Sequence, residues 1–205
     1  RSGCDLVHVA MPSKAASRCD WPTSIIPEEL PDGDFLTMSS TESIEAIIQS
    51  GRRPDSIVIG PGLGREERTI EAVQAILEMA TERGIPIVVD ADAIGALPQG
   101  KWPRGMTGVA TPHEAEASRW LGEAEPHETL SECLEEDSTI VITGPEDRLT
   151  GPSGRNASAR GGHPRMAVGG TGDLLAGAIG GLLAQGMPPW PAARLGCALL
   201  REAGE

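Results

Sequence analysis

Residues 168–177 read VGGTGDLLAG, and the rest of the chain is organised around this stretch. Its glycines, Thr171 and Asp173 lead directly into apolar residues spaced about 3.6 apart, which is the pattern of one helix face. A glycine turn therefore opens a predicted helix. The first amide groups of a helix have no intrahelical partner and lie at the positive end of the helix dipole, so this turn is a candidate anion site.

Asp173 directly follows the glycine turn and is compatible with two roles. A carboxylate in the first helical turn favours the helix electrostatically and needs no further purpose. A carboxylate beside an anion site can also take a proton from a hydroxyl group while the site holds a phosphoryl group in transfer. The residue pattern alone leaves both roles open.

Three other motifs precede this stretch, namely GPGLG at residues 60–64, VDADA at 89–93 and TPHEAE at 111–116. With GGTGD at 169–173 they resemble, in the same order, the ADP/ATP-dependent NAD(P)H-hydrate dehydratases of the ribokinase-like superfamily. Each motif alone is weak, but four in order form a specific signal. The resemblance implies a ribokinase-like three-layer α/β/α domain with a largely parallel central sheet.

The resemblance implies one such domain over residues 1–205. Family members normally carry a strand and a glycine-containing helix before the position of Arg1. We therefore expect the chain to lack this beginning and also the C-terminal end beyond Glu205.

The resemblance also implies a set of site residues. Gly62 and Gly64 would contact the hydrated nicotinamide, and His113 would bind the hydrated dinucleotide without acting as the base. Asp173 would contact the same substrate and deprotonate its hydroxyl group. The nucleotide would be held by an anion hole and a neighbouring turn, made of Thr143, Gly144, Gly170, Thr171 and Gly172.

The same resemblance implies a substrate, co-substrates and partners. NADH hydrate or NADPH hydrate would be the substrate, ADP or ATP the phosphoryl donor, and Mg²⁺ would arrive with the nucleotide phosphates. A homo-oligomer is expected, with an NAD(P)H-hydrate epimerase fused to the chain or acting as its partner.

Simpler readings of these residues stay open at this stage. GPGLG can be a tight turn between a strand and a helix, and His113 can be a surface or capping residue. Asp90 and Asp92 can bind a metal, orient the substrate, or cap the next turn and accept hydrogen bonds. No further ligands lie near these two carboxylates in the sequence, so no dedicated metal site is predicted.

The turn after residues 139–143 departs from the family pattern. Relatives usually have Lys-Gly there, with the lysine near the nucleotide phosphates, whereas this chain has Thr143-Gly144. Loss of that charge predicts weaker nucleotide binding or a changed nucleotide preference. Arg165 lies close before the signature, where it can serve a phosphate or simply be exposed.

Composition excludes several classes of function. The 205 residues carry 17 Lys and Arg against 30 Asp and Glu, a net charge of −13, which argues against nucleic acid as a partner. The four cysteines include no C-x-x-C pair, so a zinc or redox motif is not indicated. No apolar run is long enough to span a membrane and no signal peptide is recognised, so we expect a cytoplasmic protein without a membrane partner.

The remaining pattern alternates strands and helices. Strands are predicted at 5–10, 35–38, 56–59, 85–90, 108–110 and 139–143, and a hairpin at 148–150 and 157–160. Helices are predicted from the Thr41 cap to near Gly51, at 66–83, at 114–121, after the signature and at 191–201. Glycines 177, 180 and 181 would let the signature helix pack closely on the sheet.

The predicted function is therefore the nucleotide-dependent dehydration of NAD(P)H hydrate. A small-molecule kinase of the same superfamily, acting on a sugar or a hydroxymethylpyrimidine, is the alternative. A nucleotide-binding module without catalysis is a third reading, which the missing lysine supports.

Overall fold

The computed structural model describes residues 3–49, 53–122, 127–163, 166 and 168–205. The strands are β1 (His8–Pro12), β2 (Ile26–Leu30), β3 (Ile57–Ile59), β4 (Ile87–Val89), β5 (Gly108–Ala110), β6 (Ser138–Ile142), β7 (Asp147–Thr150) and β8 (Asn156–Ala159). The α-helices are α1 (Ser13–Ala16), α2 (Met38–Gln49), α3 (Glu67–Glu82), α4 (Glu114–Leu121), α5 (His127–Glu132), α6 (Thr171–Ala184) and α7 (Pro189–Ala203). Two 3-10 helices are η1 (Ala91–Ala96) and η2 (Pro152–Gly154).

Six strands form the central sheet in the order β3-β4-β5-β6-β7-β8. The first four are parallel and the last two pairings are antiparallel. β4 reads IVV and is fully buried, as is typical of a strand inside a parallel sheet, whereas β3 reads IVI and lies at the edge with Val58 exposed. The prediction of a largely parallel sheet is confirmed, and the antiparallel part is the predicted hairpin.

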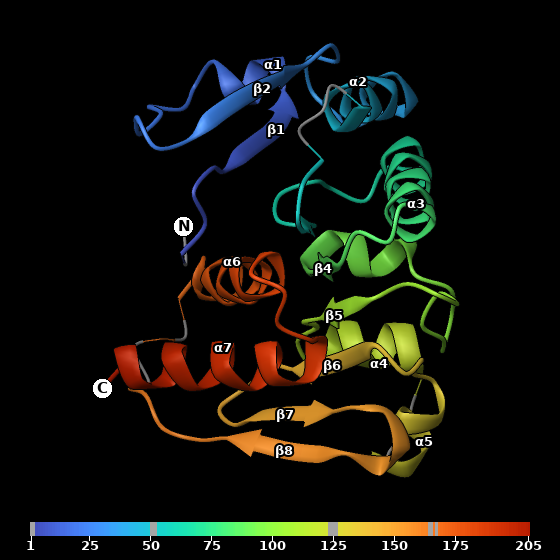
Figure 1. Cartoon of the computed structure of the whole chain (residues 1–205), viewed down its shortest axis with the longest axis vertical. Coiled ribbons are helices and arrows are strands. Elements are labelled where there is room, and N and C mark those ends of the chain that lie inside the picture. The colour runs from blue at the N-terminus through green and yellow to red at the C-terminus, as the bar shows by residue number, and fades with distance from the viewer. Residues whose placement is uncertain (1–2, 50–52, 123–126, 164–165, 167) are drawn as a thin grey trace.

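Helices cover both faces of this sheet (Figure 1). Successive side chains of a strand point to opposite faces. In β4, Ile87 and Val89 join a core shared with α3 and α4, whereas Val88 joins a second core shared with α6 and α7. The three-layer α/β/α architecture follows from this alternation.

The signature helix α6 lies against β3 and β4. A Cβ at Gly180 would lie 2.3 Å from Cγ2 of Val58, so only glycine allows the observed approach. The Ser56 hydroxyl also donates to the Gly180 carbonyl at 2.7 Å. Gly181 is buried as well, but Gly177 is exposed and has no neighbouring atom within 4 Å of a Cβ position, so the prediction that Gly177 serves packing is wrong.

A separate two-stranded sheet is formed by β1 and β2, which pair in parallel (Figure 1). No strand is predicted for Ile26–Leu30, which lies in a segment that contains several prolines. A sheet of two strands has only edge strands, where Pro27 is tolerated. Leu30 of β2 and Ile48 of α2 enter the core that contains α3. The two-stranded sheet and α2 therefore pack on the rest of the chain mainly where α2 meets α3.

The predicted strand at 35–38 is wrong, because Met38 already begins α2. The carboxylate of Asp32 accepts hydrogen bonds from the hydroxyls of Thr37 and Ser40 and turns the chain into the helix. Thr41 is therefore inside α2 instead of capping it, and its hydroxyl donates to the Met38 carbonyl at 2.6 Å. The predicted end near Gly51 lies outside the described residues.

The other predicted elements are confirmed with small changes at their ends. β5 and α4 have the predicted bounds, and β3, α3, β4, β6, the β7–β8 hairpin and α7 differ by two residues or fewer at each end. The first strand lies slightly later than predicted, at His8–Pro12. None of the helices in the described ranges has the length and apolar character needed to span a lipid bilayer.

Candidate functional site

The candidate site lies at the carboxyl edge of the parallel strands. GPGLG follows β3, Asp90 follows β4, Thr111 to His113 follow β5, and Thr143 follows β6. Because these four strands are parallel, their carboxyl ends share one edge of the sheet, the usual position of a ligand site in an open α/β fold.

The glycine loop after β3 passes directly over the end of β4. Gly60 has a φ of 140°, and a Cβ there would lie 1.7 Å from the carbonyl oxygen of Asp90. Gly62 and Gly64 have φ values of 70° and 78°, which also favour glycine, and no atom lies within 4 Å of either Cβ position. The two glycines expected to contact substrate therefore border open space.

A polar network fixes this loop to the neighbouring elements. Asp92 accepts a hydrogen bond from the Gly64 amide at 3.0 Å and another from Nε of Arg65 at 2.9 Å. Nη2 of Arg65 lies 3.9 Å from Oε1 of Glu116 on α4. The Arg65 side chain is 56% exposed. Sequence reasoning did not single out Arg65, and its position directly after the glycine loop was the available signal.

His113 is the N-cap of α4. Its Nδ1 accepts a hydrogen bond from the Ala115 amide at 3.1 Å, and its own amide donates to Oε2 of Glu116 at 3.0 Å, which completes a capping box. When the imidazole is neutral, this bond places its proton on Nε2. Nε2 lies 3.4 Å from Oε1 of Glu116, and the side chain is 55% exposed. The capping role is thus present, and the binding role stays a prediction.

Asp90 is buried at the end of β4 and has hydrogen-bonding duties. The Thr111 hydroxyl donates to its Oδ1 at 2.8 Å. Burial raises the pKa of the Asp90 carboxyl above its ordinary value, the bond from Thr111 opposes this change, and the negative charges of Glu116 and Asp173 add to it. Because α6 packs on β3 and β4 and the charge of Asp173 reaches Asp90, the signature lies toward the same edge as the β4 and β5 motifs.

The signature forms the predicted glycine turn and helix start. Gly170 is the N-cap of α6 with a φ of 93°, and its carbonyl accepts from the Leu174 amide at 3.0 Å. The Thr171 hydroxyl donates to the Met166 carbonyl at 2.7 Å. Among the described residues no acceptor is found for the amides of Gly172 and Asp173. These free donors at an exposed helix start have the properties of an anion site.

Thr143 and Gly144 lie beside the β5 motif. His113 and Thr143 form an isolated parallel bridge, and the Thr143 amide donates to the Pro112 carbonyl at 2.9 Å. The Gly144 amide donates to Oδ1 of Asp147 at 3.2 Å and is therefore engaged within the protein. The turn is fixed by internal hydrogen bonds, and its predicted contact with a nucleotide stays a prediction.

Two further predictions concern charge at the site. Arg165 lies outside the described residues, so its relation to the signature is not placed. Within the described ranges, no three His, Cys, Asp or Glu side chains are grouped closely enough to hold a metal ion. Asp90 accepts a hydrogen bond from Thr111, and Asp92 accepts hydrogen bonds from Gly64 and Arg65.

Comparison with known sequences gives consistent matches. The model of a family described as NAD(P)H-hydrate dehydratase matches residues 1–205. A bifunctional NAD(P)H-hydrate repair enzyme of Hyperthermus butylicus is 32% identical over 206 residues, covering 95% of this chain and 38% of the relative. An ADP-dependent (S)-NAD(P)H-hydrate dehydratase of Cenarchaeum symbiosum is 32% identical over 215 residues, covering 100% of this chain and 72% of the relative. The chain thus spans well under half the length of the bifunctional relatives that it matches.

Solved structures show the same architecture. A ribokinase-like superfamily protein of Enterococcus faecalis has a TM-score of 0.75 and 25% identity, covering 98% of this chain and 69% of its own. An ADP/ATP-dependent NAD(P)H-hydrate dehydratase of Bacillus subtilis, co-crystallised with ATP and Mg²⁺, has a TM-score of 0.57 and 30% identity. That match covers 72% of this chain and 54% of the other.

Proposed function

Because the chain belongs to the NAD(P)H-hydrate dehydratase family, we propose that it returns hydrated NADH or NADPH to the reduced dinucleotide, with ADP or ATP as phosphoryl donor. The observation that supports this most directly is the position of Asp173. Its carboxylate lies in the first turn of α6, beside amides without an acceptor among the described residues, and its charge acts on Asp90 at the edge where the other motifs end.

The proposed reaction uses a phosphoryl group to turn a poor leaving group into a good one. Asp173 accepts the proton of the hydroxyl group on the hydrated nicotinamide ring, and that oxygen forms a bond to the terminal phosphorus of the nucleotide. The bond from this phosphorus to the bridging oxygen breaks, which releases AMP or ADP. The carbon–oxygen bond then breaks to release phosphate, and a proton leaves the adjacent carbon as the ring double bond forms.

The anion site at the start of α6 would hold the transferred group during this step. The amides of Gly172 and Asp173 would donate to the charge that develops on the phosphoryl oxygens, and positioning of this kind is the main contribution of a protein to phosphoryl transfer. Gly170 and Thr171 shape the turn. Gly62, Gly64 and His113 would contact the hydrated ring from the opposite side of the edge.

Magnesium fits this site as a companion of the nucleotide. The Bacillus subtilis relative was co-crystallised with ATP and Mg²⁺. Mg²⁺ is commonly held by substrate phosphates with one or two protein carboxylates, so a cage of several acidic residues is not required. Asp173 is the carboxylate in the helical turn where the phosphates would bind, and the ion would neutralise charge on these phosphates.

Two partner relationships extend the proposal. Because many relatives are bifunctional repair enzymes, we infer that the chain works with an NAD(P)H-hydrate epimerase, either fused or separate. A homo-oligomer and a cytoplasmic location stay predictions.

One assay distinguishes the proposed function from its alternatives. Hydrated NADH or NADPH is incubated with the protein, Mg²⁺ and either ADP or ATP, and the absorbance of the reduced dinucleotide is followed. Nucleotide-dependent recovery of absorbance supports the dehydratase. Parallel incubations replace the hydrate with a sugar or a hydroxymethylpyrimidine. A phosphorylated product there, without recovery of absorbance from the hydrate, would indicate a kinase. Nucleotide binding without turnover of any of these substrates would indicate a binding module.

The variant Asp173→Asn tests the role of the carboxylate. Asn has nearly the same shape and suits a helix start, but it cannot accept the proton, so we expect kcat to fall by roughly 10²–10⁴-fold. Melting temperature and nucleotide affinity should change little, because a first-turn charge is worth only about 0.3–1 kcal/mol.

The matched control is Glu67→Gln, which removes an exposed first-turn carboxylate from α3 instead of α6. Its kcat should equal that of the unmodified protein. If folded Asp173→Asn keeps more than about a tenth of the original rate, Asp173 is not the base.

A further inference from the structure

Arg201 makes an unusually complete set of hydrogen bonds in the last turn of α7. Its Nε and Nη2 donate to the two carboxylate oxygens of Asp147 at 2.9 and 2.6 Å. Nη2 also donates to the Gly144 carbonyl at 2.6 Å, and Nη1 to the carbonyls of Pro145 and Gly161 at 3.0 and 3.2 Å. The side chains of Arg201 and Asp147 are 13% and 5% exposed, so the pair is nearly buried.

These bonds connect two segments that are far apart in the sequence. The first is the turn after β6, which contains Gly144 and is held again by the bond from the Gly144 amide to Asp147. The second is the segment at Gly161, which leads to the signature and is also tied to α7 by the bond from the His163 amide to the Gly204 carbonyl at 3.0 Å. The first segment contains Thr143 and Gly144, which the resemblance assigns to the nucleotide, and the second precedes the signature in the sequence.

The chemistry of the pair indicates positioning instead of direct phosphate binding. A bidentate guanidinium–carboxylate pair is directional and has little net charge to offer a phosphate. Burying such a pair gives weak net stabilisation, but its fork geometry fixes the groups that it holds. The three carbonyl oxygens held by Arg201 belong to backbone turns, and the backbone of these turns determines where their remaining groups point.

We infer that Arg201 is a positioning residue of the nucleotide site, which holds the turn after β6 and the approach to the signature in the arrangement that binds ADP or ATP. This chain has Thr143 where relatives usually have a lysine at that turn, so the position of the turn cannot rely on a lysine–phosphate contact. The inference rests on the proposed function for the identity of the nucleotide.

The test compares the two substrates of the same reaction. In Arg201→Met, the KM for ADP or ATP should rise by roughly tenfold or more, because several charge-assisted hydrogen bonds are lost. The KM for NAD(P)H hydrate should change less than about twofold, because GPGLG lies on another element and His113 keeps the capping box that holds it at the start of α4. Arg201→Lys keeps the charge but not the fork, and should recover only part of the loss.

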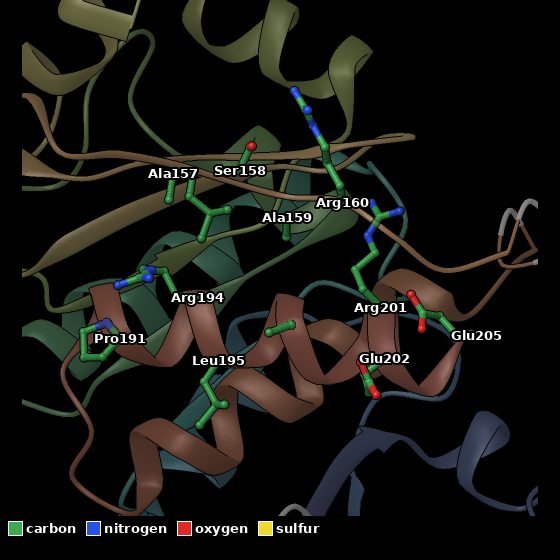
Figure 2. A pocket seen from close by; sticks show the side chains of 12 residues that line it. Ala157, Ser158, Ala159, Arg160, Pro191, Arg194, Leu195, Arg201, Glu202 and Glu205 are labelled. Atoms are coloured by element: carbon green, nitrogen blue, oxygen red, sulfur yellow. The ribbon is translucent and has the colours of Figure 1, made fainter.

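Arg194→Met is the matched control. Arg194 lies two turns earlier on α7 and is exposed. Both arginines border a pocket of about 600 Å³ between α7 and the β7–β8 hairpin. Figure 2 shows both arginines directed from α7 toward the hairpin. The control should keep both KM values.

A second variant covers the risk that an unpaired Asp147 prevents folding. The double variant Arg201→Met with Asp147→Asn removes both buried charges, and should show the same selective rise in the nucleotide KM. Calorimetric titration with Mg-ATP in the absence of hydrate should show the same fold-change in Kd.

The outcomes separate the inference from the proposed function. Equal rises in both KM values, or unchanged nucleotide binding in the folded variants, would overturn the positioning role. An unmodified protein that binds Mg-ATP but does not act on the hydrate would remove the proposed function, and calorimetry would still decide the role of Arg201. An unmodified protein that binds neither ADP nor ATP would contradict both.

Discussion

The imidazole of His113 has both nitrogens near protein groups, Nδ1 at the Ala115 amide and Nε2 at 3.4 Å from Oε1 of Glu116, yet more than half of its side chain is exposed. Nδ1 accepts from the Ala115 amide at the start of α4, while the side chain as a whole is 55% exposed. A neutral ring bonded in this way carries its N–H at Nε2, near Glu116, and leaves the rest of the exposed ring for contact with a substrate. One residue can therefore stabilise the helix start and also contact a substrate, and substitutions can separate the two contributions.

A pair of substitutions at His113 distinguishes these contributions. His113→Ala should raise the KM for NAD(P)H hydrate with a smaller fall in kcat, and should also lower the free energy of unfolding by about 0.5–2 kcal/mol through loss of the cap. His113→Asn should raise the KM in the same way but retain most of the stability, because Asn is a good N-cap. Steady-state kinetics and thermal melts provide both readouts.

Two results would contradict this account of His113. A fall in kcat by orders of magnitude at unchanged KM would mean that the residue takes part in proton transfer. Unchanged kinetics in both variants would leave only the capping role.

At the scale of elements, the close packing of α6 on β3 and β4 determines where its first turn, which carries Asp173, lies relative to the sheet. Gly180 provides this approach, since its backbone packs on Val58 and accepts the hydrogen bond from Ser56. Gly196 of α7 allows a similarly close approach between α7 and α6, because a Cβ there would lie 2.6 Å from Cγ1 of Ile179. The glycines thus set the distances between layers, and these distances place the first turn of α6 at the edge of the sheet.

Two glycine substitutions in α6 should have opposite effects on stability. Gly180→Ala should lower the free energy of unfolding by about 1–3 kcal/mol, because the added methyl group overlaps Val58. Gly177→Ala should raise it by about 0.5–1 kcal/mol, because this position is open and alanine favours a helix. Denaturant unfolding of both variants measures the difference, and a stable Gly180→Ala protein would show that the layers can separate without cost.

At the scale of the whole molecule, charge works against the compact state. The chain carries 30 acidic and 17 basic side chains, a net charge of −13. The excess carboxylates repel one another more strongly in the folded protein, where they are closer together, than in the extended chain. The same surplus repels an anionic nucleotide, so a local anion site such as the start of α6 is needed to bind it.

Added salt should therefore stabilise the protein. Raising NaCl from about 0.01 M to about 0.15 M shortens the Debye length from about 30 Å to about 8 Å and screens the repulsion. We expect the melting temperature to rise over this range. Sodium sulfate at equal ionic strength is the control, because screening predicts an equal rise, whereas exclusion from the protein surface predicts a larger rise with sulfate. A constant or falling melting temperature in NaCl would contradict the argument.

The sequence by itself determined the order of elements wherever the signal is local. β5 and α4 were predicted with their observed bounds, because a short buried run, a proline and a helix start follow one another directly at residues 108–114. The glycine turn before α6 was also readable, because glycine, helix periodicity and Asp173 are adjacent. GPGLG and TPHEAE also follow predicted strands directly, so their place at strand ends is local information.

Tertiary structure alone decided the features that depend on partners distant in the chain. Ile26–Leu30 is a strand because β1 pairs with it, and Arg201 meets Gly144 across 57 positions of sequence. Asp32 sets the start of α2 by binding two hydroxyls further along, which displaces the expected strand at 35–38. The physical reason is that propensity and periodicity report on neighbouring residues, whereas strand pairing and buried ion pairs depend on which surfaces meet after the chain has folded.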